Sequence, residues 1–398
     1  MKKTVCELFA GVGGFRVGLE AAGKWDFVWS NQWEPGKTVQ YAFDCYCKHF
    51  GNNPNHINMD IASVDKYSIP NHNLLVGGFP CQDYSVARTG AQGISGKKGV
   101  LWWQIRDVLI AKAPPFVLLE NVDRLLKSPA KQKGRDFGIM LSCFNDLGYS
   151  VEWRVINAAE YGFAQRRRRV FIFAFKNSTK FHSNLFIDNL GNWIHSNGFF
   201  QNEFPVEDIC GKFTETYMEY DNILEISDTF HLDFKNSGIM SNGKIYTEET
   251  APIYKEPIKL RDILEHNVSE DYFLKGNFEK WKVLKGSKRI ERVTREGFKY
   301  IFSEGNMEFP DPLTRPARTM LTSESSLNRS THVIEDPNTG DLRLLTPVET
   351  ERINGFPDNW TNTGMPTKFR YFCMGNALVV GLIKKMGRTL NQILETEE

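Results

Sequence analysis

One cysteine of this sequence lies where a reactive thiol would be expected. In "NLLVGGFPCQDYS", Cys81 follows Pro80 and precedes Gln82, where an apolar run ends in turn-forming residues. A buried strand that ends in a tight turn would hold a thiol rigidly at the edge of a sheet. Nucleophilic thiolates need partial exposure and an electropositive environment. Cys81 is therefore a candidate nucleophile, whereas a cysteine taken at random is more often a small buried hydrophobe.

A carboxylate and a run of arginines supply further candidates. "PFVLLENV" reaches Glu120 after an apolar run, and partial desolvation there suits a carboxyl group to protonate or hydrogen-bond a ring nitrogen. "QRRRR" places arginines 166–169 before the apolar run "VFIFAF", and alternation puts Arg167 and Arg169 on one face. Solvated charges are the simpler alternative for both motifs. The apolar strand behind the arginines favours binding of phosphate, carboxylate or a ring carbonyl.

A glycine-rich stretch, "ELFAGVGGFRVGLE", joins an expected strand to an expected helix. Gly11, Gly13 and Gly14 would let the backbone approach a ligand at the helix N-terminus. Arg16 occupies the third-glycine position of the dinucleotide fingerprint, so a simple strand-to-helix turn remains an alternative to a nucleotide-like cofactor site. The next strand ends in "NQWEP", which offers an aromatic ring for stacking and an amide or acid for ribose hydroxyls. These candidates are Gln32, Trp33 and Glu34.

Strand-like and helical patterns alternate through the first 176 residues. Continuously apolar strands between helices predict an α/β fold with a doubly wound, mostly parallel sheet. Open sheets of this kind bind ligands at the carboxyl ends of their strands. A third strand would end at Asp60-Ile61, and these two residues, the glycine turn, Cys81 and Glu120 would share that edge. The expected strands are 4–11, 25–34, 73–80, 115–122 and 168–176, and the expected helices are 15–22, 39–50 and 100–112.

The pattern changes after residue 176. Residues 177 to about 310 show no clear periodicity, whereas 345–357 and 375–394 return to helical spacing, and the last helix is amphipathic. We therefore expect three parts. They are a catalytic and cofactor-binding domain at 1–176, a second, smaller domain at 177–339, and a C-terminal segment at 340–398 that returns to the first domain.

Composition excludes several classes of protein. A chain of 398 residues with 41% hydrophobic and 24% charged residues is typical of a soluble globular protein of two or three domains. No apolar run approaches the length of a membrane span and no signal peptide is evident, so a cytoplasmic location without membrane association is expected. The seven scattered cysteines have no zinc-ligand spacing, and no metal is expected. With a net charge of +1, any surface for nucleic acid must be local.

In combination, these motifs resemble the cytosine-C5 DNA methyltransferases, which use S-adenosylmethionine and release S-adenosylhomocysteine. "FAGVGGF", "GGFPCQDYS", "ENV", "QRRRR" and "GNA" occur in the family's order, and the resemblance covers residues 1–176 and about 311–398. It implies a Rossmann-like methyltransferase fold and a monomeric enzyme that acts on double-stranded DNA. It also implies a restriction–modification system, with a restriction endonuclease that acts independently. Residues 177–339 would form the target-recognition domain.

The resemblance also implies roles for single residues. Cys81 would attack C6 of a flipped-out cytosine, Glu120 would grip N3 and the exocyclic amine, and Arg169 would hold the base carbonyl. Arg167 occupies the other arginine position of the Gln-x-Arg-x-Arg motif. Gln32 departs from the family, which usually has a ribose-binding acid there. The residues that would line the cofactor site are Phe9, Gly11, Gly13, Gly14, Gln32, Trp33, Glu34, Asp60, Ile61, Pro80, Leu101 and Asn376.

The expected DNA surface is a local basic stretch. Residues 280–299 hold eight basic residues against two acids, interleaved with aromatic and apolar positions, and an exposed charged hairpin or helix is the alternative. Three arginines in 314–334 are candidates for phosphate contacts, with structural pairing as an equal alternative. The candidate DNA-binding residues are Gln82, Ser85, Lys280, Trp281, Lys285, Arg315, Arg318 and Arg329.

Three rival functions follow from the same motifs. A tRNA-modifying relative is disfavoured because the region between the two parts that resemble the family is long, whereas relatives with that substrate tend to have a shorter one. A catalytically silent DNA-binding relative is disfavoured because Cys81, Glu120 and Arg169 are all present. A nicotinamide dehydrogenase is disfavoured by Arg16 and would leave the Cys81 motif without a use.

Overall fold

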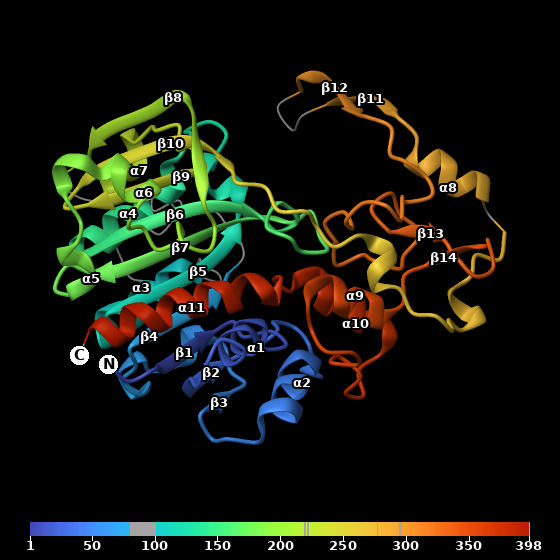
Figure 1. The fold of residues 1–398 in the computed structure, drawn as a ribbon, viewed down its shortest axis with the longest axis horizontal. Helices are drawn as coiled ribbons and strands as arrows, with labels where there is room; N and C mark the ends of the chain where they lie inside the picture. The colour runs from blue at the N-terminus through green and yellow to red at the C-terminus, as the bar shows by residue number, and fades with distance from the viewer. Residues whose placement is uncertain (80–100, 219, 221–222, 277, 294–296, 398) are drawn as a thin grey trace. The chain divides into compact units, whose positions relative to one another are not determined.

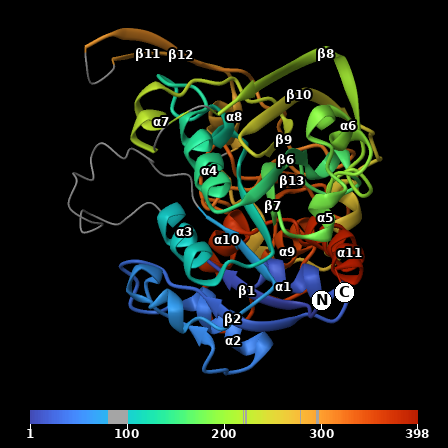
Figure 2. The same ribbon diagram turned by 90° about the vertical axis from the view of Figure 1, so that its left-hand side faces the viewer.

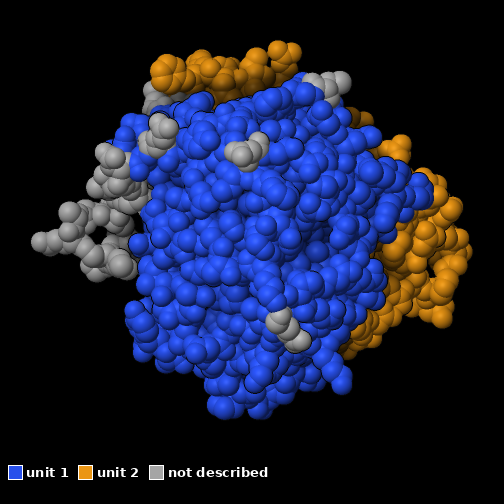
Figure 3. Space-filling view, turned by 60° about the vertical axis from the view of Figure 1, so that its left-hand side comes forward, with its two compact units in different colours: residues 1–162, 167–256, 379–398 blue, residues 163–166, 257–378 orange. Residues whose placement is uncertain are grey.

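The chain folds into two compact units. The computed structural model describes residues 1–79, 101–218, 220, 223–276, 278–293 and 297–397, so Pro80, Cys81, Gln82 and Ser85 lie outside the described residues. Unit 1 comprises residues 1–162, 167–256 and 379–398, and unit 2 comprises 163–166 and 257–378 (Figure 3). These divisions differ from the boundaries expected at 177 and 340, because residues 177–256 build onto the sheet of unit 1.

Unit 1 contains a sheet in which ten strands are described (Figure 1). Its first five strands are parallel, with β1 between β2 and β4, so the chain winds outward from β1 in both directions as predicted. The other five continue the sheet in antiparallel pairs. In sheet order the strands are β3 (His56–Ile57), β2 (Asp26–Asn31), β1 (Thr4–Leu8), β4 (Leu74–Gly78), β5 (Phe116–Val122), β7 (Arg168–Lys176), β6 (Tyr149–Asn157), β9 (Ser237–Ser241), β10 (Lys244–Pro252) and β8 (Val206–Tyr217).

Helices cover both faces of this sheet (Figure 2). Helices α3, α4 and α7 lie on one face, and α1, α5, α6 and α11 lie on the other. The last helix packs so closely on α1 that a Cβ added to Gly18 would lie 2.5 Å from Cβ of Ile383. None of the described helices is both long enough and apolar enough to cross a membrane. The helices of unit 1 are α1 (Gly14–Glu20), α2 (Tyr41–Phe50), α3 (Leu101–Lys112), α4 (Arg135–Asp146), α5 (Lys180–Ser183), α6 (Leu190–His195), α7 (Ile223–Thr229) and α11 (Val380–Thr396).

Buried polar contacts fix residues 190–205 to strand β6. Glu152 accepts hydrogen bonds from Nε1 of Trp193 at 2.9 Å and from the backbone N–H of Phe199 at 2.7 Å. Arg154 donates to the backbone carbonyls of Ile194 and Phe204 at 2.9 and 2.7 Å. Both charged side chains are buried, and buried charges are stable only when they are paired and hydrogen-bonded. These contacts explain why the segment after residue 177 belongs to unit 1.

Unit 2 consists of short elements joined by long connections. Arg343 is fully buried between Asp336 and Glu349, and this ion cluster ties the β13–β14 hairpin to the start of α9. Thr346 and Glu349 form a capping box at the same helix end. The elements are α8 (Phe278–Lys285), β11 (Lys288–Val293), β12 (Lys299–Glu304), β13 (Val333–Glu335), β14 (Leu342–Leu344), α9 (Pro347–Asn354) and α10 (Thr367–Asn376).

Candidate active site

The motifs of unit 1 meet at the carboxyl ends of the parallel strands. Leu8 of β1 pairs in register with Asn31 of β2 and Gly77 of β4, and Gly78 pairs with Glu120 of β5. The glycine turn, "QWE" and "EN" therefore follow neighbouring strand ends. The backbone N–H of Phe79 donates to the carbonyl of Glu120 at 3.4 Å. Cys81 comes two residues later in the sequence.

Glu120 and Arg169 form an ion pair at this edge. Strands β5 and β7 are antiparallel, and their register brings the two side chains together, with Nε of Arg169 2.9 Å from Oε1 of Glu120. The side chains keep 13% and 17% of their surface exposed, so the pair remains accessible to a ligand. A Cβ on Gly78 would lie 3.1 Å from Oε2 of Glu120, so only a glycine leaves this carboxylate uncrowded.

The arginine run alternates as the sequence predicted. Arg167 is buried and Arg169 is half-buried, whereas Arg166 and Arg168 are exposed. Burial and the neighbouring charge of Arg169 together lower the pKa of Arg167 to about 9, and the charge of Glu120 opposes both. Arg167 therefore stays cationic at neutral pH. Arg168 forms a surface ion pair with Asp123 at 3.2 Å.

The glycine turn after β1 leaves room for a ligand. Gly11 has a φ of +56°, and a Cβ built there would meet no atom within 4 Å. Gly13 has a φ of +89°, and its Cβ would lie 2.5 Å from the ring of Phe50, so this glycine is needed for packing. Oε1 of Gln32 accepts a hydrogen bond from the backbone N–H of Gly11 at 2.7 Å. Gln32 thus holds the shape of the turn.

Glu34 presents a carboxyl oxygen that the protein does not satisfy. Its backbone is clamped by Gln40, whose side chain accepts from the Glu34 N–H at 2.8 Å and donates to the Glu34 carbonyl at 3.0 Å. Oε2 of Glu34 is buried and has no hydrogen-bond partner in the described part of the chain. Burial raises the pKa of Glu34, against the charge of Lys37 and a hydrogen bond from the backbone of Ala42. A buried, unsatisfied oxygen is an acceptor suited to a ligand hydroxyl.

The remaining cofactor candidates take different positions. Strand β3 ends at Ile57, so the prediction that a third strand reaches Asp60-Ile61 was wrong. Asp60 instead caps the short 3-10 helix Ile61–Ser63 by accepting the Ala62 N–H at 3.0 Å, and Ile61 is buried in the apolar core. Leu101 begins α3, Trp33 is half-buried, and Asn376 ends α10 in unit 2. Phe9 has a left-handed backbone, with a φ of 56°, directly before the glycine turn.

Some residues of the predicted DNA-binding surface are buried inside the protein. Trp281 and Lys285 are only 4% and 1% exposed, so their assignment to a DNA-facing surface was wrong. Lys285 pairs with Asp311 at 3.4 Å and also donates to the carbonyl of Thr331. Trp281 and Lys285 lie one turn apart on the buried side of α8, and Asp311 neutralises the lysine there.

The three candidate arginines of unit 2 have internal partners. Nε of Arg318 lies 2.6 Å from the Asp311 carboxylate. Arg329 donates to the backbone carbonyl of Leu284 at 3.0 Å and to those of Gly286 and Gly305. Structural pairing therefore accounts for Arg318 and Arg329. Arg315 makes an exposed ion pair with Glu308 at 3.1 Å, and exposed pairs of this kind are weak enough to exchange partners.

Two residues with a clear structural role went unnoticed in the sequence, and a third, Arg16, was noticed without its contacts being predicted. Gln165, the first residue of "QRRRR", is fully buried in unit 2, where its Nε2 donates to Oδ1 of Asn354 at 2.8 Å. Glu7 is a buried acid in β1 that accepts the hydroxyl of Tyr46 at 2.9 Å. Only a weak signal in the sequence marks these two residues: Glu7 is a polar residue within an apolar strand, and Gln165 is part of the arginine motif. Arg16 replaces the expected third glycine, and its guanidinium lies 4.2 Å from the Phe50 ring centroid.

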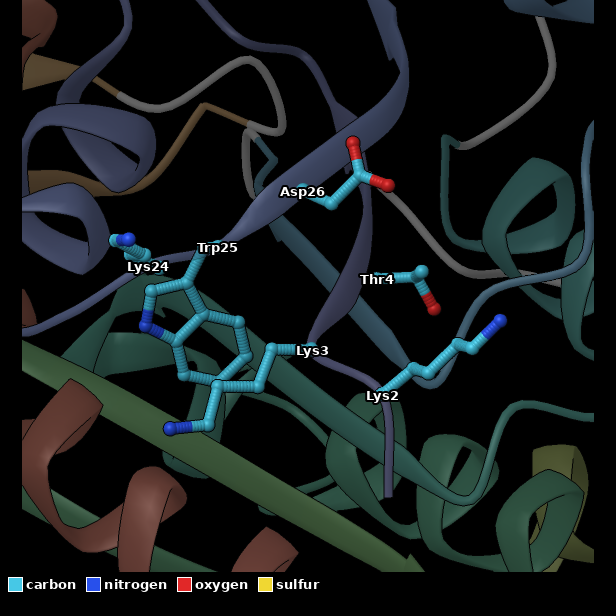
Figure 4. Close-up of a pocket in the computed structure, with 6 residues that line it drawn as sticks. All are labelled: Lys2, Lys3, Thr4, Lys24, Trp25 and Asp26. Carbon is cyan, nitrogen blue, oxygen red and sulfur yellow. The ribbon is translucent and has the colours of Figure 1, made fainter.

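A pocket of about 320 Å³ lies at the opposite ends of the strands (Figure 4). It opens beside the amino ends of β1 and β2, where Nζ of Lys3 lies 6.0 Å from the ring centroid of Trp25. Since the catalytic candidates follow the carboxyl ends, this pocket is not the candidate active site. Its lining residues are Lys2, Lys3, Thr4, Lys24, Trp25 and Asp26.

Comparisons with known proteins agree with this geometry. The family model described as C-5 cytosine-specific DNA methylase matches residues 3–392. The Type II methyltransferase M.Sau3AI of Staphylococcus aureus is 54% identical over 401 residues, which cover 98% of this chain and 96% of that one. The fold is similar to the S. pombe Dnmt2 methyltransferase and the Entamoeba histolytica methyltransferase EhMeth, each with a TM-score of 0.61, 16% identity and 99% of both chains covered. This chain belongs to the C-5 cytosine-specific DNA methylase family.

Proposed function

We propose that this protein is the DNA (cytosine-5)-methyltransferase of a type II restriction–modification system. It would act in the cytoplasm, as a monomer, on cytosine in a specific short sequence of duplex DNA, independently of any partner endonuclease. Family membership and the 54% identity to a type II methyltransferase support this proposal. The observation that carries it is the Glu120–Arg169 pair, with atoms 2.9 Å apart, at the strand edge where β4 leads toward Cys81.

The residues at the edge fit S-adenosylmethionine, the methyl donor that the family implies. The open space at Gly11 admits a ligand close to the backbone. The unsatisfied Oε2 of Glu34 would accept a ribose hydroxyl, the half-buried Trp33 would stack on the adenine, and Gln32 would keep the glycine turn in place. When bound, this cofactor supplies an electrophilic methyl group on sulfur.

The cytosine ring must first be made nucleophilic. The thiolate of Cys81 adds to C6, which breaks the aromaticity of the ring and moves electron density toward N3. Glu120 donates a proton or hydrogen bond at N3, so that C5 becomes enamine-like and takes the methyl group. A base then removes the proton from C5, and elimination releases the Cys81 thiolate from C6. After the elimination Cys81 is again a thiolate, and Glu120 has regained any proton that it gave to N3.

Arg169 and Arg167 would position the base for this chemistry. Arg169 holds the Glu120 carboxylate before the base binds and would donate to the carbonyl oxygen of the base afterwards. Arg167, buried and cationic beside this pair, adds positive charge that favours the Cys81 thiolate. Since C6 is unreachable in a stacked duplex, the cytosine must leave the helix, which costs roughly a few kcal/mol.

Target recognition is assigned to only a part of residues 177–339, the region that was expected to perform it. Residues 177–256 extend the sheet of unit 1, so recognition falls to 257–339 of unit 2. Lys280 and Arg315 remain candidates for phosphate contacts because their side chains are exposed.

Transfer of tritiated methyl groups from S-adenosylmethionine to mixed duplex DNA tests the proposal. The products are digested to nucleosides, and wild type is compared with Cys81→Ala. We expect label in 5-methylcytosine that disappears with the variant, while the variant binds S-adenosylhomocysteine with nearly unchanged affinity. Label in tRNA but not in DNA would overturn the assigned substrate. Loss of cofactor binding in Cys81→Ala would overturn the role of the cysteine.

A further inference from the structure

The β11–β12 hairpin of unit 2 is a two-stranded ribbon that extends away from the other strands of its unit (Figure 1). Both of its faces carry exposed apolar side chains: Ile290 and Tyr300 are 44% and 45% exposed, and Val293 and Ile301 are 60% and 55% exposed. A two-stranded hairpin is at best marginally stable alone, and clustered exposed apolar residues mark a binding surface. The exposed apolar side chains therefore indicate that the ribbon binds a partner.

The strand register sorts the ribbon into two different faces. Ile290 pairs with Phe302 and Arg292 pairs with Tyr300, so these four side chains share one face, called here the aromatic face. The opposite face carries the exposed Arg289 and an ion pair between Glu291 and Lys299 at 3.3 Å. The aromatic face is the one on which a cation, Arg292, lies over an aromatic ring of the ribbon.

Arg292 is held in a fixed orientation. Its guanidinium carbon lies 3.8 Å from the ring centroid of Phe302. Within the described residues, Arg292 has neither a hydrogen bond nor an ion pair, so its N–H donors are available to a ligand. A stacked guanidinium with free edges presents a rigid fork of donors, the geometry that reads paired acceptors.

The base of the ribbon is anchored in unit 2. Arg329 donates to the carbonyls of Leu284 and Gly286 before β11, and to the carbonyl of Gly305 after β12. The buried Lys285 fixes the end of α8 at the same point. A ribbon fixed at one end and exposed along its length is able to reach into a partner without losing its register.

We propose that this ribbon enters the major groove of the target duplex, and that Arg292 reads a guanine through O6 and N7. The inference rests on the proposed function. The major groove admits a two-stranded ribbon, and guanine offers the paired acceptors that an arginine fork prefers. Residues 288–304 hold five basic residues against three acids, a charge that suits DNA. Tyr300 and Ile290 would contact base edges and thymine methyl groups beside Arg292.

Site mapping and binding measurements test the assignment. Bisulfite sequencing of plasmid DNA treated with wild type first defines the methylated site. Duplexes with and without that site are then titrated with wild type, Arg292→Ala and Arg292→Lys, in fixed salt, by fluorescence anisotropy. We expect Arg292→Ala to weaken binding to the site by roughly ten- to hundredfold, with little change for the duplex without it. Arg292→Lys keeps the charge but loses the fork, so it should lose most of the discrimination.

Matched controls separate this role from a general effect of exposed residues. Arg261→Ala removes a cation that is 54% exposed in the same unit, and Tyr254→Ala removes a tyrosine that is 60% exposed. Both should bind the site as wild type does, whereas Tyr300→Ala should weaken it. Affinity for S-adenosylhomocysteine should be unchanged in all variants.

Replacement of guanine by 7-deazaguanine, one position at a time, gives the sharpest test because it removes only the N7 acceptor. We expect one position to weaken wild type and to leave Arg292→Ala unaffected. Unchanged site affinity and methylation pattern in Arg292→Ala would overturn the proposal. If wild type sedimented as an oligomer and Arg292→Ala as a smaller species, the ribbon would be a contact between copies of this chain, and the proposal would be overturned. A wild type that forms no 5-methylcytosine would overturn the proposed function itself, whatever the hairpin variants do.

Discussion

The two units use arginine–carboxylate pairs in opposite ways. In unit 2, Arg343 is fully buried, with Asp336 at 2.6 Å and Glu349 at 2.8 Å. In unit 1, Glu120 and Arg169 meet at the end of their strands and keep part of their surface exposed. The first cluster has all its partners inside the protein, whereas the second is able to exchange its partner for a ligand. A pair of the same chemistry thus stabilises a fold in one unit and marks a site in the other.

Electrostatics supports this contrast in unit 2. Burial alone would raise the pKa of Asp336, but the hydrogen bond and charge of Arg343 lower it below its usual value. Burial would likewise lower the pKa of Arg343, yet its bonds to Glu349 and Asp336 raise it. Asp336 and Arg343 are therefore both charged at neutral pH, and their charges compensate one another.

The strongest test of the contrast is Glu120→Gln. The amide has the same size, but it cannot supply a proton at N3, so we expect kcat to fall by roughly 10²- to 10⁴-fold. Because the pair is partly exposed, the free energy of unfolding should change by less than about 1 kcal/mol. Steady-state methyl transfer and thermal unfolding measure the two effects. Asp123→Asn, which removes the exposed partner of Arg168, is the control and should retain the wild-type rate. A stability loss in Glu120→Gln as large as its loss of activity would break the comparison.

Arg343→Ala should have the opposite profile. It leaves two carboxylates buried without their cation, which destabilises a protein by about 3–5 kcal/mol. Chemical denaturation followed by fluorescence would report this loss. The folded fraction should still methylate DNA at a rate close to that of wild type. Wild-type stability in this variant would show that the cluster is not structural.

A pH titration of stability extends the comparison to a buried acid that contacts a hydroxyl instead of a cation. Burial raises the pKa of Glu7 from its usual value of 4.5 to about 8, against the Tyr46 hydrogen bond and the charge of Arg16. The folded state thus binds more protons than the unfolded state between these values. Stability should fall as pH rises from about 4.5 to about 8, by at most roughly 1.4 kcal/mol per pH unit. In Glu7→Gln this slope should flatten. An unchanged slope would mean that another group titrates.

The smallest effect is expected at Arg315, whose ion pair with Glu308 is exposed on both sides. Arg315→Ala should change the free energy of unfolding by less than about 0.5 kcal/mol. Arg318→Ala, which strips a cation from the buried Asp311, should destabilise several times more. If the two variants lost the same free energy of unfolding in the same denaturation experiment, burial would not be what decides how much each ion pair stabilises the protein.

The parallel half of the sheet could be predicted from the sequence because its strands carry their own signal. Strand β7 spans the predicted residues 168–176, and its continuous apolar run leaves no other interpretation. Glu120 and Arg169 could be placed beside these strands for a related reason, since Glu120 lies near the end of β5 and Arg169 near the start of β7. Their pairing follows from the antiparallel register, which the sequence does not show. Strand β9 gave no comparable signal. The segment "SGIMS" is short, and Gly238 packs against Trp153 of β6, which pairs with β9 but is far away in the sequence.

The basic stretch at 280–299 shows where sequence reasoning fails. A run of lysines predicts a solvated surface, but α8 buries Trp281 and Lys285. The partner that makes burial of the lysine possible, Asp311, lies 26 residues further along the chain. No local pattern reveals such a pair. Arg292, from the same stretch, is exposed, and only the structure distinguishes it from the two buried residues.

Covalent trapping on a duplex that carries 5-fluorocytosine at the mapped site tests the central claim most directly. After methyl transfer, fluorine on C5 cannot leave as the proton does, so the thioether between Cys81 and C6 would persist. We predict a cofactor-dependent protein–DNA adduct whose tryptic peptide contains Cys81, and no adduct with Cys81→Ala. Methylation of ordinary DNA without any adduct on the fluorinated duplex, or an adduct at another cysteine, would contradict the account.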